Sequence, residues 1–118
     1  MVEKLLVYQK AYPLALEVHK LTLHFPKHEQ YGGLADQLRR SSKSIVANLT
    51  EGYTIKTIYP AKYKTYLTQA IGSTEESILW LRFAEDLGYT EGSVQVLRDR
   101  YQEIGKMLYG LLRATKIV

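Results

Sequence analysis

The stretch YGGLADQLRRSSKSIVANLTEGY, residues 31–53, decides the fold of this chain. After Gly32 and Gly33, one set of residues recurs at alternating steps of four and three, which is the repeat of a single helical face directed into a bundle. That face mixes apolar residues with small and polar ones: Leu34, Leu38, Ser41, Ile45, Asn48 and Gly52. Small side chains let a neighbouring helix approach closely, and a buried serine or asparagine needs hydrogen-bond partners. The stretch therefore predicts a helix that holds its neighbour in a specified position.

The same three-and-four repeat marks three other helices. We expect them over residues 5–25, 60–87 and 91–115, and the helix of the opening stretch should end between residues 53 and 56. The core faces of these three helices are Val7, Ala11, Leu14, Val18, Leu21 and Phe25; Leu67, Ala70, Thr74, Ser77, Leu81 and Ala84; and Val94, Leu97, Tyr101, Ile104, Leu108 and Leu111. Four helices joined by short turns predict an all-α fold, an antiparallel up-down-up-down four-helix bundle forming one domain over residues 1–118.

Prolines and glycines set the expected boundaries. Pro13 lies inside the first helix, so we expect either a kink near residues 8–9 or a helix that begins only near Tyr12. Pro60 suits the first position of the third helix, where its missing N–H costs nothing. Gly88 is well placed to cap that helix in a left-handed conformation.

The composition indicates a soluble protein of a reducing compartment. The 118 residues include no cysteine, which excludes disulfides and thiolate chemistry. No apolar run approaches the roughly 20 residues of a membrane span, and no export signal opens the chain, so we expect a cytoplasmic protein without a membrane partner. The formal net charge of +4 is a mild basic bias, although five copies in one assembly would carry about +20.

Several phrases of the sequence resemble one known family. They are FPKHEQYG at 25–32 and QLRRSSKSIVANLTEG at 37–52, accompanied in the expected order by LLVYQKAYPLALEVHKLTLHFP, YLTQAIGSTEESILWLRFAEDLGY and EIGKMLYGLLRA. Over nearly all its length the chain resembles the four-helix-bundle protein family encoded in intervening sequences of bacterial 23S rRNA genes. It departs from the family pattern at Lys43, Val46 and Thr50, and residues 54–59 lack the Arg-Ser pair that usually follows Glu-Gly.

The resemblance implies an assembly and a type of partner. Relatives of the family form homopentameric rings with a central channel. The family is also similar in fold and assembly to the accessory variability protein of diversity-generating retroelements, a basic ring that works with a reverse transcriptase and RNA. We interpret Asn48, Glu51 and Gly52 as a structural signature, in which Glu51 pairs with Asn48, or with Arg39 or Arg40 of a neighbouring helix or subunit.

Two groups of basic residues are candidates for binding RNA or DNA: Arg39, Arg40 and Lys43 in one, and Lys56, Lys62 and Lys64 in the other. The first group either contacts phosphates or forms ordinary ion pairs with residues such as Asp36, each worth about 0.3–0.5 kcal/mol. The second group lies among Tyr53, Tyr59, Tyr63 and Tyr66, a mixture that suits phosphate contact with base stacking. The alternative, which we favour, is that Tyr63 and Tyr66 cap the bundle with their hydroxyls in water beside solvated lysines.

Apolar residues left over from the core indicate a self-association surface. Leu16 and Leu23 are one heptad apart and lie on a different side of their helix from Val18. The candidate oligomer interface is Leu16, Leu23, Trp80, Phe83 and Tyr109. The alternative is a wide core stripe or a few exposed leucines, which are ordinary on protein surfaces.

The sequence contains no recognisable catalytic or metal-binding pattern. His24 and His28 are four residues apart but straddle Pro26, so they cannot share a helical face as zinc ligands do. The acids of the third helix lack the Glu-x-x-His pairs of di-iron bundles and should face solvent; they are Glu75, Glu76, Glu85 and Asp86. We therefore expect a protein that is not an enzyme and holds no cofactor and no metal.

The sequence as a whole favours a non-enzymatic homo-oligomeric scaffold, with a pentamer preferred. It would bind nucleic acid, or a nucleic-acid-processing partner such as a reverse transcriptase, through its basic edges. The competing hypothesis is a protein-only helical interaction module that binds no nucleic acid. Ionic strength separates the two, because phosphate contacts weaken steeply with salt and an apolar interface does not.

Overall fold

Four α-helices form the computed structural model, which describes residues 1–115. They are α1 (Leu6–Thr22), α2 (Leu34–Ile55), α3 (Pro60–Asp86) and α4 (Gln95–Ala114), with two short 3-10 helices, η1 (Val2–Lys4) and η2 (Lys27–Glu29). No strand occurs among the described residues, so the all-α prediction is confirmed. The predicted domain extends to residue 118, and its last three residues lie outside the described part of the chain.

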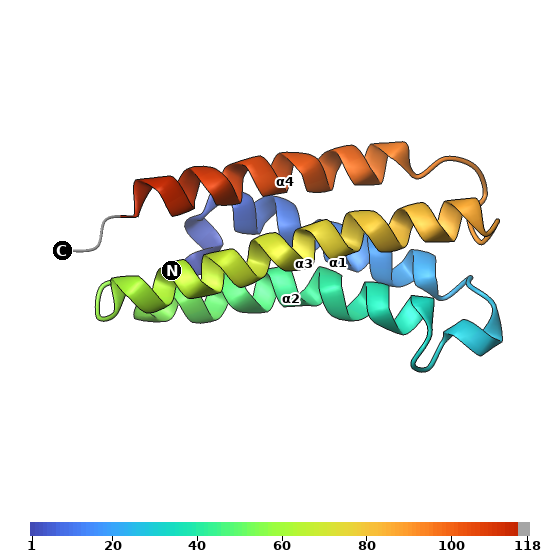
Figure 1. Ribbon diagram of the computed structural model, residues 1–118, viewed down its shortest axis with the longest axis horizontal. Helices are drawn as coiled ribbons and strands as arrows, with labels where there is room; N and C mark the ends of the chain where they lie inside the picture. Colours follow the sequence, from blue (N-terminus) through green and yellow to red (C-terminus); the bar gives the residue numbers. More distant parts are fainter. Residues whose placement is uncertain (116–118) are drawn as a thin grey trace.

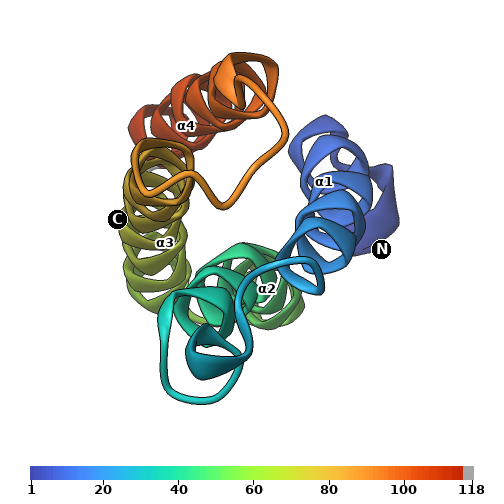
Figure 2. The same cartoon turned by 90° about the vertical axis from the view of Figure 1, so that its right-hand side faces the viewer.

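Successive helices run in opposite directions along the 49 Å length of the molecule (Figure 1). Seen end-on, they follow one another around a common centre in the order α1, α2, α3, α4 (Figure 2). Each helix contacts the two that flank it, including α1 with α4. This is the predicted up-down-up-down arrangement. No helix in residues 1–115 is both long enough and apolar enough to cross a membrane.

The predicted core faces point into the centre of the bundle. All six predicted residues of α3 are buried, and in α4 the side chains of Tyr101, Ile104 and Leu108 are at most 1% exposed. In α2 the seam is buried from Leu34 to Gly52 except for Asn48, which is half-buried. The three-and-four repeat therefore located the core correctly.

A line of hydroxyl groups joins α2 to α3. Ser41 Oγ lies 2.8 Å from Ser77 Oγ, and Ser73 Oγ donates to Ser44 Oγ at 2.9 Å. Asn48 Nδ2 donates to the same Ser44 Oγ at 3.0 Å. The hydrogen-bond partners that the sequence required for Ser41 and Asn48 are thus present. We call this line of residues the serine seam.

Gly52 continues the close contact between α2 and α3 beyond the serine seam. A Cβ atom added at this position would lie 2.9 Å from the Cβ of Tyr66 and 3.2 Å from the Cδ1 of Tyr63. Real Cβ atoms do not approach a neighbour so closely, so a larger residue would push the two helices apart. The small residue at this place in the seam is therefore a packing requirement.

The first helix differs from its predicted extent at both ends. It begins at Leu6 and continues through Pro13, so the alternative start near Tyr12 is wrong. It stops at Thr22, three residues before the predicted end. After Thr22 the chain forms a tighter 3-10-type turn, in which the Phe25 N–H donates to the Thr22 carbonyl. Phe25 is nevertheless buried, as expected.

Pro60 and Gly88 bound α3 as predicted. Pro60 occupies the first turn, and Gly88 has a φ of +78°. The Tyr89 N–H donates to the Ala84 carbonyl at 2.8 Å, and the Gly88 N–H donates to the Glu85 carbonyl at 3.0 Å. These two bonds are the Schellman pattern that satisfies the last carbonyls of a helix.

The start of α4 at Gln95, four residues later than predicted, has a local cause. Gly92 has a φ of +94°, which a helix does not accommodate. Glu85 Oε1 then accepts a hydrogen bond from the Val94 N–H at 2.6 Å. Glu85 is half-buried and bonded to the Val94 N–H, so the prediction that it faces solvent is wrong. The other three acids of α3, Glu75, Glu76 and Asp86, are exposed as predicted.

The N-terminus of α2 is satisfied by a residue of η2 and not by a serine or aspartate at the cap. Glu29 Oε1 accepts from the Leu34 N–H at 2.9 Å, and Glu29 Oε2 accepts from the Tyr89 hydroxyl at 2.8 Å. These two hydrogen bonds, the backbone one first, hold the pKa of Glu29 below its ordinary value of 4.5. One carboxylate therefore connects η2, the start of α2 and the loop after α3.

The replacement Ile45→Asp should unfold the protein. Ile45 is fully buried on the α2 face, so the variant would place an unpaired charge in the core and lose about 4 kcal/mol or more of stability. Gln37→Asp is the matched control, because Gln37 is exposed in the first turn of α2, where an acid is tolerated. Circular dichroism melts of both variants check the expectation, and a folded Ile45→Asp protein would contradict the assignment of this face.

Glu29 should make the stability of the protein depend on acid. Because its pKa is lower in the folded state, its contribution is complete above the ordinary pKa of 4.5 and is lost as the pH falls through the lowered folded value. Glu29→Gln should therefore lose less stability than the wild type between pH 7 and pH 3. Urea unfolding at the two pH values measures this difference. The exposed Glu91→Gln change is the control and should behave as the wild type does.

Candidate functional site

Arg39 does not belong to an exposed basic patch. Its guanidinium turns towards α1 and η2, where Nη1 donates to Thr22 Oγ1 at 3.1 Å and to Gln30 Oε1 at 2.9 Å. Nη2 donates to the Gln30 carbonyl. Gln30 in turn donates to the carbonyls of Thr22 and Phe25. Three hydrogen bonds of Arg39 are thus used within the chain, where they hold the α1–η2 connection against α2. The phosphate contact proposed for Arg39 stays a prediction.

Arg40 and Lys43 are exposed but point to different neighbours. Arg40 Nε lies 3.5 Å from Asp36 Oδ1, which is the ordinary helical ion pair expected from the spacing. Lys43 Nζ lies 3.0 Å from His19 Nδ1 on α1. Burial of His19, then the positive charges of Lys43 and Arg39, lower the pKa of the imidazole. A neutral His19 accepts a hydrogen bond from Lys43, which is then left without a carboxylate partner.

The second basic group gathers at the end of the bundle where α2 turns into α3. Lys56 Nζ lies 5.9 Å from the ring centre of Tyr53 and 5.4 Å from that of Tyr63. Lys62 Nζ lies 5.8 Å from the ring centre of Tyr59. Tyr59 is 58% exposed, so one face of its ring is open to solvent. We call Tyr53, Lys56, Tyr59 and Lys62 the lysine–tyrosine end.

No acidic residue neutralises this end among the described residues. The four ion pairs of residues 1–115 use Lys10, Arg40, Arg82 and Arg100. Lys56, Lys62 and Lys64 therefore have no carboxylate within 4 Å. The two predicted basic groups are separate along the fold: Arg39, Arg40 and Lys43 lie in the first half of α2, whereas Lys56 follows its last residue and Lys62 and Lys64 lie at the start of α3.

Tyr63 occupies a different position from the one we favoured. Its side chain is 1% exposed and its hydroxyl is buried without a hydrogen-bond partner, so the expectation of a hydroxyl in water is wrong. Burial raises the pKa of Tyr63, followed by the effect of Tyr53, and the hydroxyl stays neutral. The ring packs beneath Lys56 and against Gly52, which is why an aromatic residue is buried at this end.

An apolar groove follows the edge between α1 and α2. It has a volume of about 320 Å³ and is lined by Tyr12, Ala15, Leu16, Lys43, Val46 and Ala47. We call it the α1–α2 groove. Leu16 is 49% exposed, and Leu23, further along α1, is 59% exposed. The α2 side of this groove was not predicted, although Val46 and Ala47 follow Lys43 at the three-and-four steps that place residues on one helical face.

The remaining candidates for an oligomer interface lie elsewhere. Phe83 and Tyr109 are each 47% exposed, on α3 and α4 respectively. Trp80 is half-buried, with its ring centre 6.0 Å from that of Phe83. The five predicted residues thus come from three helices: Leu16 and Leu23 from α1 and its C-terminal end, Trp80 and Phe83 from α3, and Tyr109 from α4.

Glu51 makes no hydrogen bond or ion pair with Asn48, Arg39 or Arg40 among residues 1–115. It is exposed, whereas Asn48 is bonded to Ser44 through both the Ser44 carbonyl and hydroxyl. Arg39 and Arg40 are occupied by Gln30 and Asp36. The expected buried pair of Glu51 and Asn48 is therefore wrong, and Gly52 is the member of the signature with a packing role.

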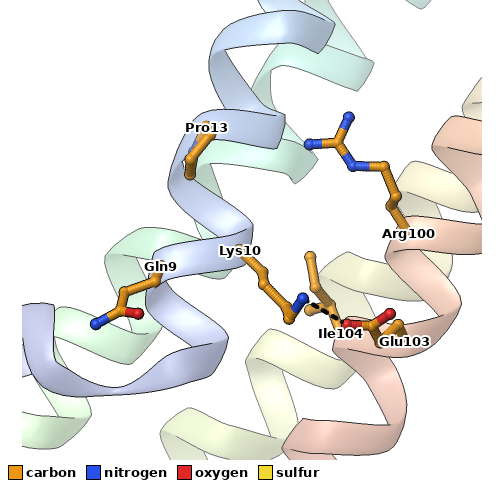
Figure 3. A pocket seen from close by; sticks show the side chains of 6 residues that line it. All are labelled: Gln9, Lys10, Pro13, Arg100, Glu103 and Ile104. Atoms are coloured by element: carbon orange, nitrogen blue, oxygen red, sulfur yellow. Dashed lines mark ion pairs between the residues drawn. The ribbon is translucent and has the colours of Figure 1, made fainter.

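A second groove, of about 200 Å³, separates α1 from α4 (Figure 3). Its charged groups neutralise one another. Lys10 Nζ lies 2.8 Å from Glu103 Oε1, and Arg100 Nη1 lies 2.6 Å from Glu17 Oε2. In residues 1–115, no three histidine or acidic side chains gather as a metal site would require. The two ion pairs therefore fasten α1 to α4 and leave no unpaired acid or base for chemistry.

Comparisons with known proteins agree with this fold. The family model described as 23S rRNA-intervening sequence protein matches residues 3–110. A crystal structure from Bacteroides thetaiotaomicron, of a protein with unknown function from the S23 ribosomal protein family, superposes with a TM-score of 0.80. It is 22% identical, and the superposition covers 92% of this chain and 100% of that chain, a likeness that concerns the fold. No curated protein matches the sequence significantly.

Replacing Arg39 should destabilise the protein, although Arg39 lies outside the core face. Arg39→Ala removes charged hydrogen bonds to Thr22 and Gln30 and should cost about 1.5–3 kcal/mol. Arg39→Lys should recover little, since one ammonium cannot reproduce the forked donors. Arg40→Ala is the control and should change the stability by less than about 1 kcal/mol, because its ion pair is exposed. Urea unfolding measures all three, and equal stabilities of Arg39→Ala and Arg40→Ala would contradict this role.

Proposed function

We propose a scaffold function with a nucleic-acid-binding end for this chain, which belongs to the family of 23S rRNA-intervening sequence proteins. In this proposal the protein is not an enzyme. It binds RNA or DNA through the lysine–tyrosine end and associates with copies of itself through its exposed apolar edges. A pentamer is the preferred assembly, and a nucleic-acid-processing protein such as a reverse transcriptase is the preferred partner.

The observation that carries the proposal is the combination of unpaired lysines and one accessible aromatic ring, that of Tyr59, at one end. Lys56 and Lys62 lie within 6 Å of tyrosine ring centres and have no carboxylate partner among the described residues. Lysines held in this way offer their charge to phosphates, and the open face of Tyr59 offers a stacking surface to a base. Unstacked bases of a single strand or a loop fit such a surface better than a duplex does.

Self-association would strengthen weak binding at each end. A single end supplies few phosphate contacts, so its affinity alone is modest. Several ends held in one assembly bind one strand together, because the second contact is made at a high effective concentration. The exposed Leu16 and Leu23 support an assembly, since apolar residues at such spacing on one helical face are typical of an interface.

The competing function is a protein-only helical interaction module. The α1–α2 groove favours it, because a groove lined mainly by apolar side chains accepts the apolar face of a partner helix. That module would bind its partner with little dependence on ionic strength. The two functions are therefore separated by the same salt titration.

Removing Lys56 and Lys62 together should weaken binding to a single-stranded RNA or DNA oligonucleotide and reduce its dependence on salt. Two lost phosphate contacts should lower the slope of log K against log salt by about 1.4. Tyr59→Ala should cost about 1–3 kcal/mol through lost stacking while leaving that slope unchanged. Fluorescence anisotropy titrations at several salt concentrations measure both effects.

The matched control removes two exposed lysines elsewhere, Lys27 and Lys106, with the same change in net charge. Binding that falls equally in the control would indicate only a general charge effect. A wild-type protein that binds neither RNA nor DNA at low salt would exclude the nucleic-acid function and favour the protein-only module.

A further inference from the structure

We propose that the α1–α2 groove of one copy receives an apolar ridge on α3 of a second copy, in a head-to-tail contact. The α3 ridge is formed by Leu79, Phe83 and Leu87. This inference rests on the self-association part of the proposed function and specifies the two surfaces that meet. It does not depend on nucleic-acid binding.

The ridge is apolar and about half exposed. Leu79 and Phe83 are four residues apart on α3, and Leu87, four residues further, directly follows the last residue of the helix. The three side chains are 46%, 47% and 54% exposed in chain order. The ring centre of Trp80 lies 6.0 Å from that of Phe83. An aromatic side chain packed against a second aromatic ring is the kind of residue that anchors a protein interface.

The groove is concave and also apolar. Its deepest lining residues by burial are Ala15, which is buried, and Val46, which is half-buried, whereas Tyr12, Leu16 and Ala47 are exposed. Tyr12 stacks on Tyr8, with ring centres 5.9 Å apart. A groove lined by two alanines, a valine and larger apolar side chains fits a protruding aromatic or leucine side chain.

The charges beside the two surfaces are complementary. The groove is lined by Lys43, which lies 3.0 Å from His19 Nδ1 and has no ion pair among the described residues, and the exposed Lys20 follows Leu16 by one turn of α1. Two acidic residues follow lining residues of the groove in sequence. Glu17, next to Leu16, pairs with Arg100 of α4, and Glu51 lies one turn after Ala47 on α2. The ridge is preceded on its own face by Glu76, three residues before Leu79, and Glu76 has no ion pair among the described residues. Arg82 is already paired with Asp86 at 3.9 Å.

The two surfaces belong to different helices, so the contact joins unlike patches. A dimer with a twofold axis uses the same patch on both subunits, whereas a contact between unlike patches leaves one groove and one ridge unoccupied. Further copies then add until the assembly closes into a ring. The chain itself carries both an apolar groove lined by the unpaired Lys43 and an apolar ridge preceded by the unpaired Glu76, and for this reason we assign a second copy of the chain as the occupant.

The test uses one variant for each surface. Leu16→Glu blocks the groove, Phe83→Glu blocks the ridge, and Val96→Glu is the control at a residue that is 71% exposed outside both surfaces. Light scattering should give the wild-type oligomer mass for Val96→Glu and a monomer mass for the other two. An equimolar mixture of Leu16→Glu and Phe83→Glu should form dimers, because each supplies the surface that the other lacks, and should stop there.

Cross-linking gives a second readout with milder substitutions. The chain has no cysteine, so Leu16→Cys and Phe83→Cys each introduce a single thiol. A short bis-maleimide reagent should link the two variants when they are mixed and should link neither variant to itself. Self-linking of Leu16→Cys alone would indicate a twofold contact and overturn the inference.

The outcomes also separate this inference from the proposed function. An oligomeric wild type whose mass is unchanged by Phe83→Glu overturns the groove-and-ridge contact and leaves self-association intact. A wild type that is monomeric at every concentration removes self-association, and with it this inference. Nucleic-acid binding is measured independently in either case.

Discussion

The serine seam between α2 and α3 is the constraint on which the rest of the bundle depends. Hydroxyl groups at Ser41, Ser44, Ser73 and Ser77 meet in pairs across the two helices, and Gly52 extends the close contact to their joined end. A shift of one residue along either helix would separate both pairs and lose two interhelical hydrogen bonds, each worth about 0.5–1.5 kcal/mol, while Ser41 and Ser77 would keep only their bonds to carbonyls of their own helices. An all-leucine seam would tolerate such a shift more easily. The polar seam therefore fixes the register of α3 on α2.

That register determines which side chains pack together at the turn between the two helices. With α3 held close at Gly52, the ring of Tyr63 is buried beneath the end of α2 and Lys56 lies over it. Lys62 is one turn into α3 and lies over Tyr59. The lysine–tyrosine end is thus a product of the same close packing that orders the core. A looser pair of helices would present these lysines as separate solvated side chains.

The contact between α1 and α4 is of a different kind from that between α2 and α3. Whereas α2 and α3 share hydroxyls, α1 is fastened to α4 by two exposed ion pairs, and its end is fastened to α2 by Arg39. Exposed ion pairs contribute little to stability, so α1 is retained chiefly by its buried face. Its exposed side carries Tyr12, Leu16 and Leu23, which are 48%, 49% and 59% exposed. The same helix therefore combines polar attachments to α4 and α2 with an apolar surface, of which Tyr12 and Leu16 line the α1–α2 groove.

The sequence was sufficient where one periodic signal decided the structure, and insufficient where partners came from loops. Helical repeats, Pro60 and Gly88 predicted four helices, their core faces and the ends of α3. The partners of Arg39, Thr22 and Gln30, could not be predicted because they are brought together by an irregular connection that has no repeat. The late start of α4 depends in the same way on Glu85 capturing the Val94 N–H across a turn. The role of a basic residue beside a helical core face therefore cannot be assigned until the structure of the neighbouring loop is known. Arg39 and Arg40 show this directly, since adjacent arginines in one helix have an internal and an exposed role.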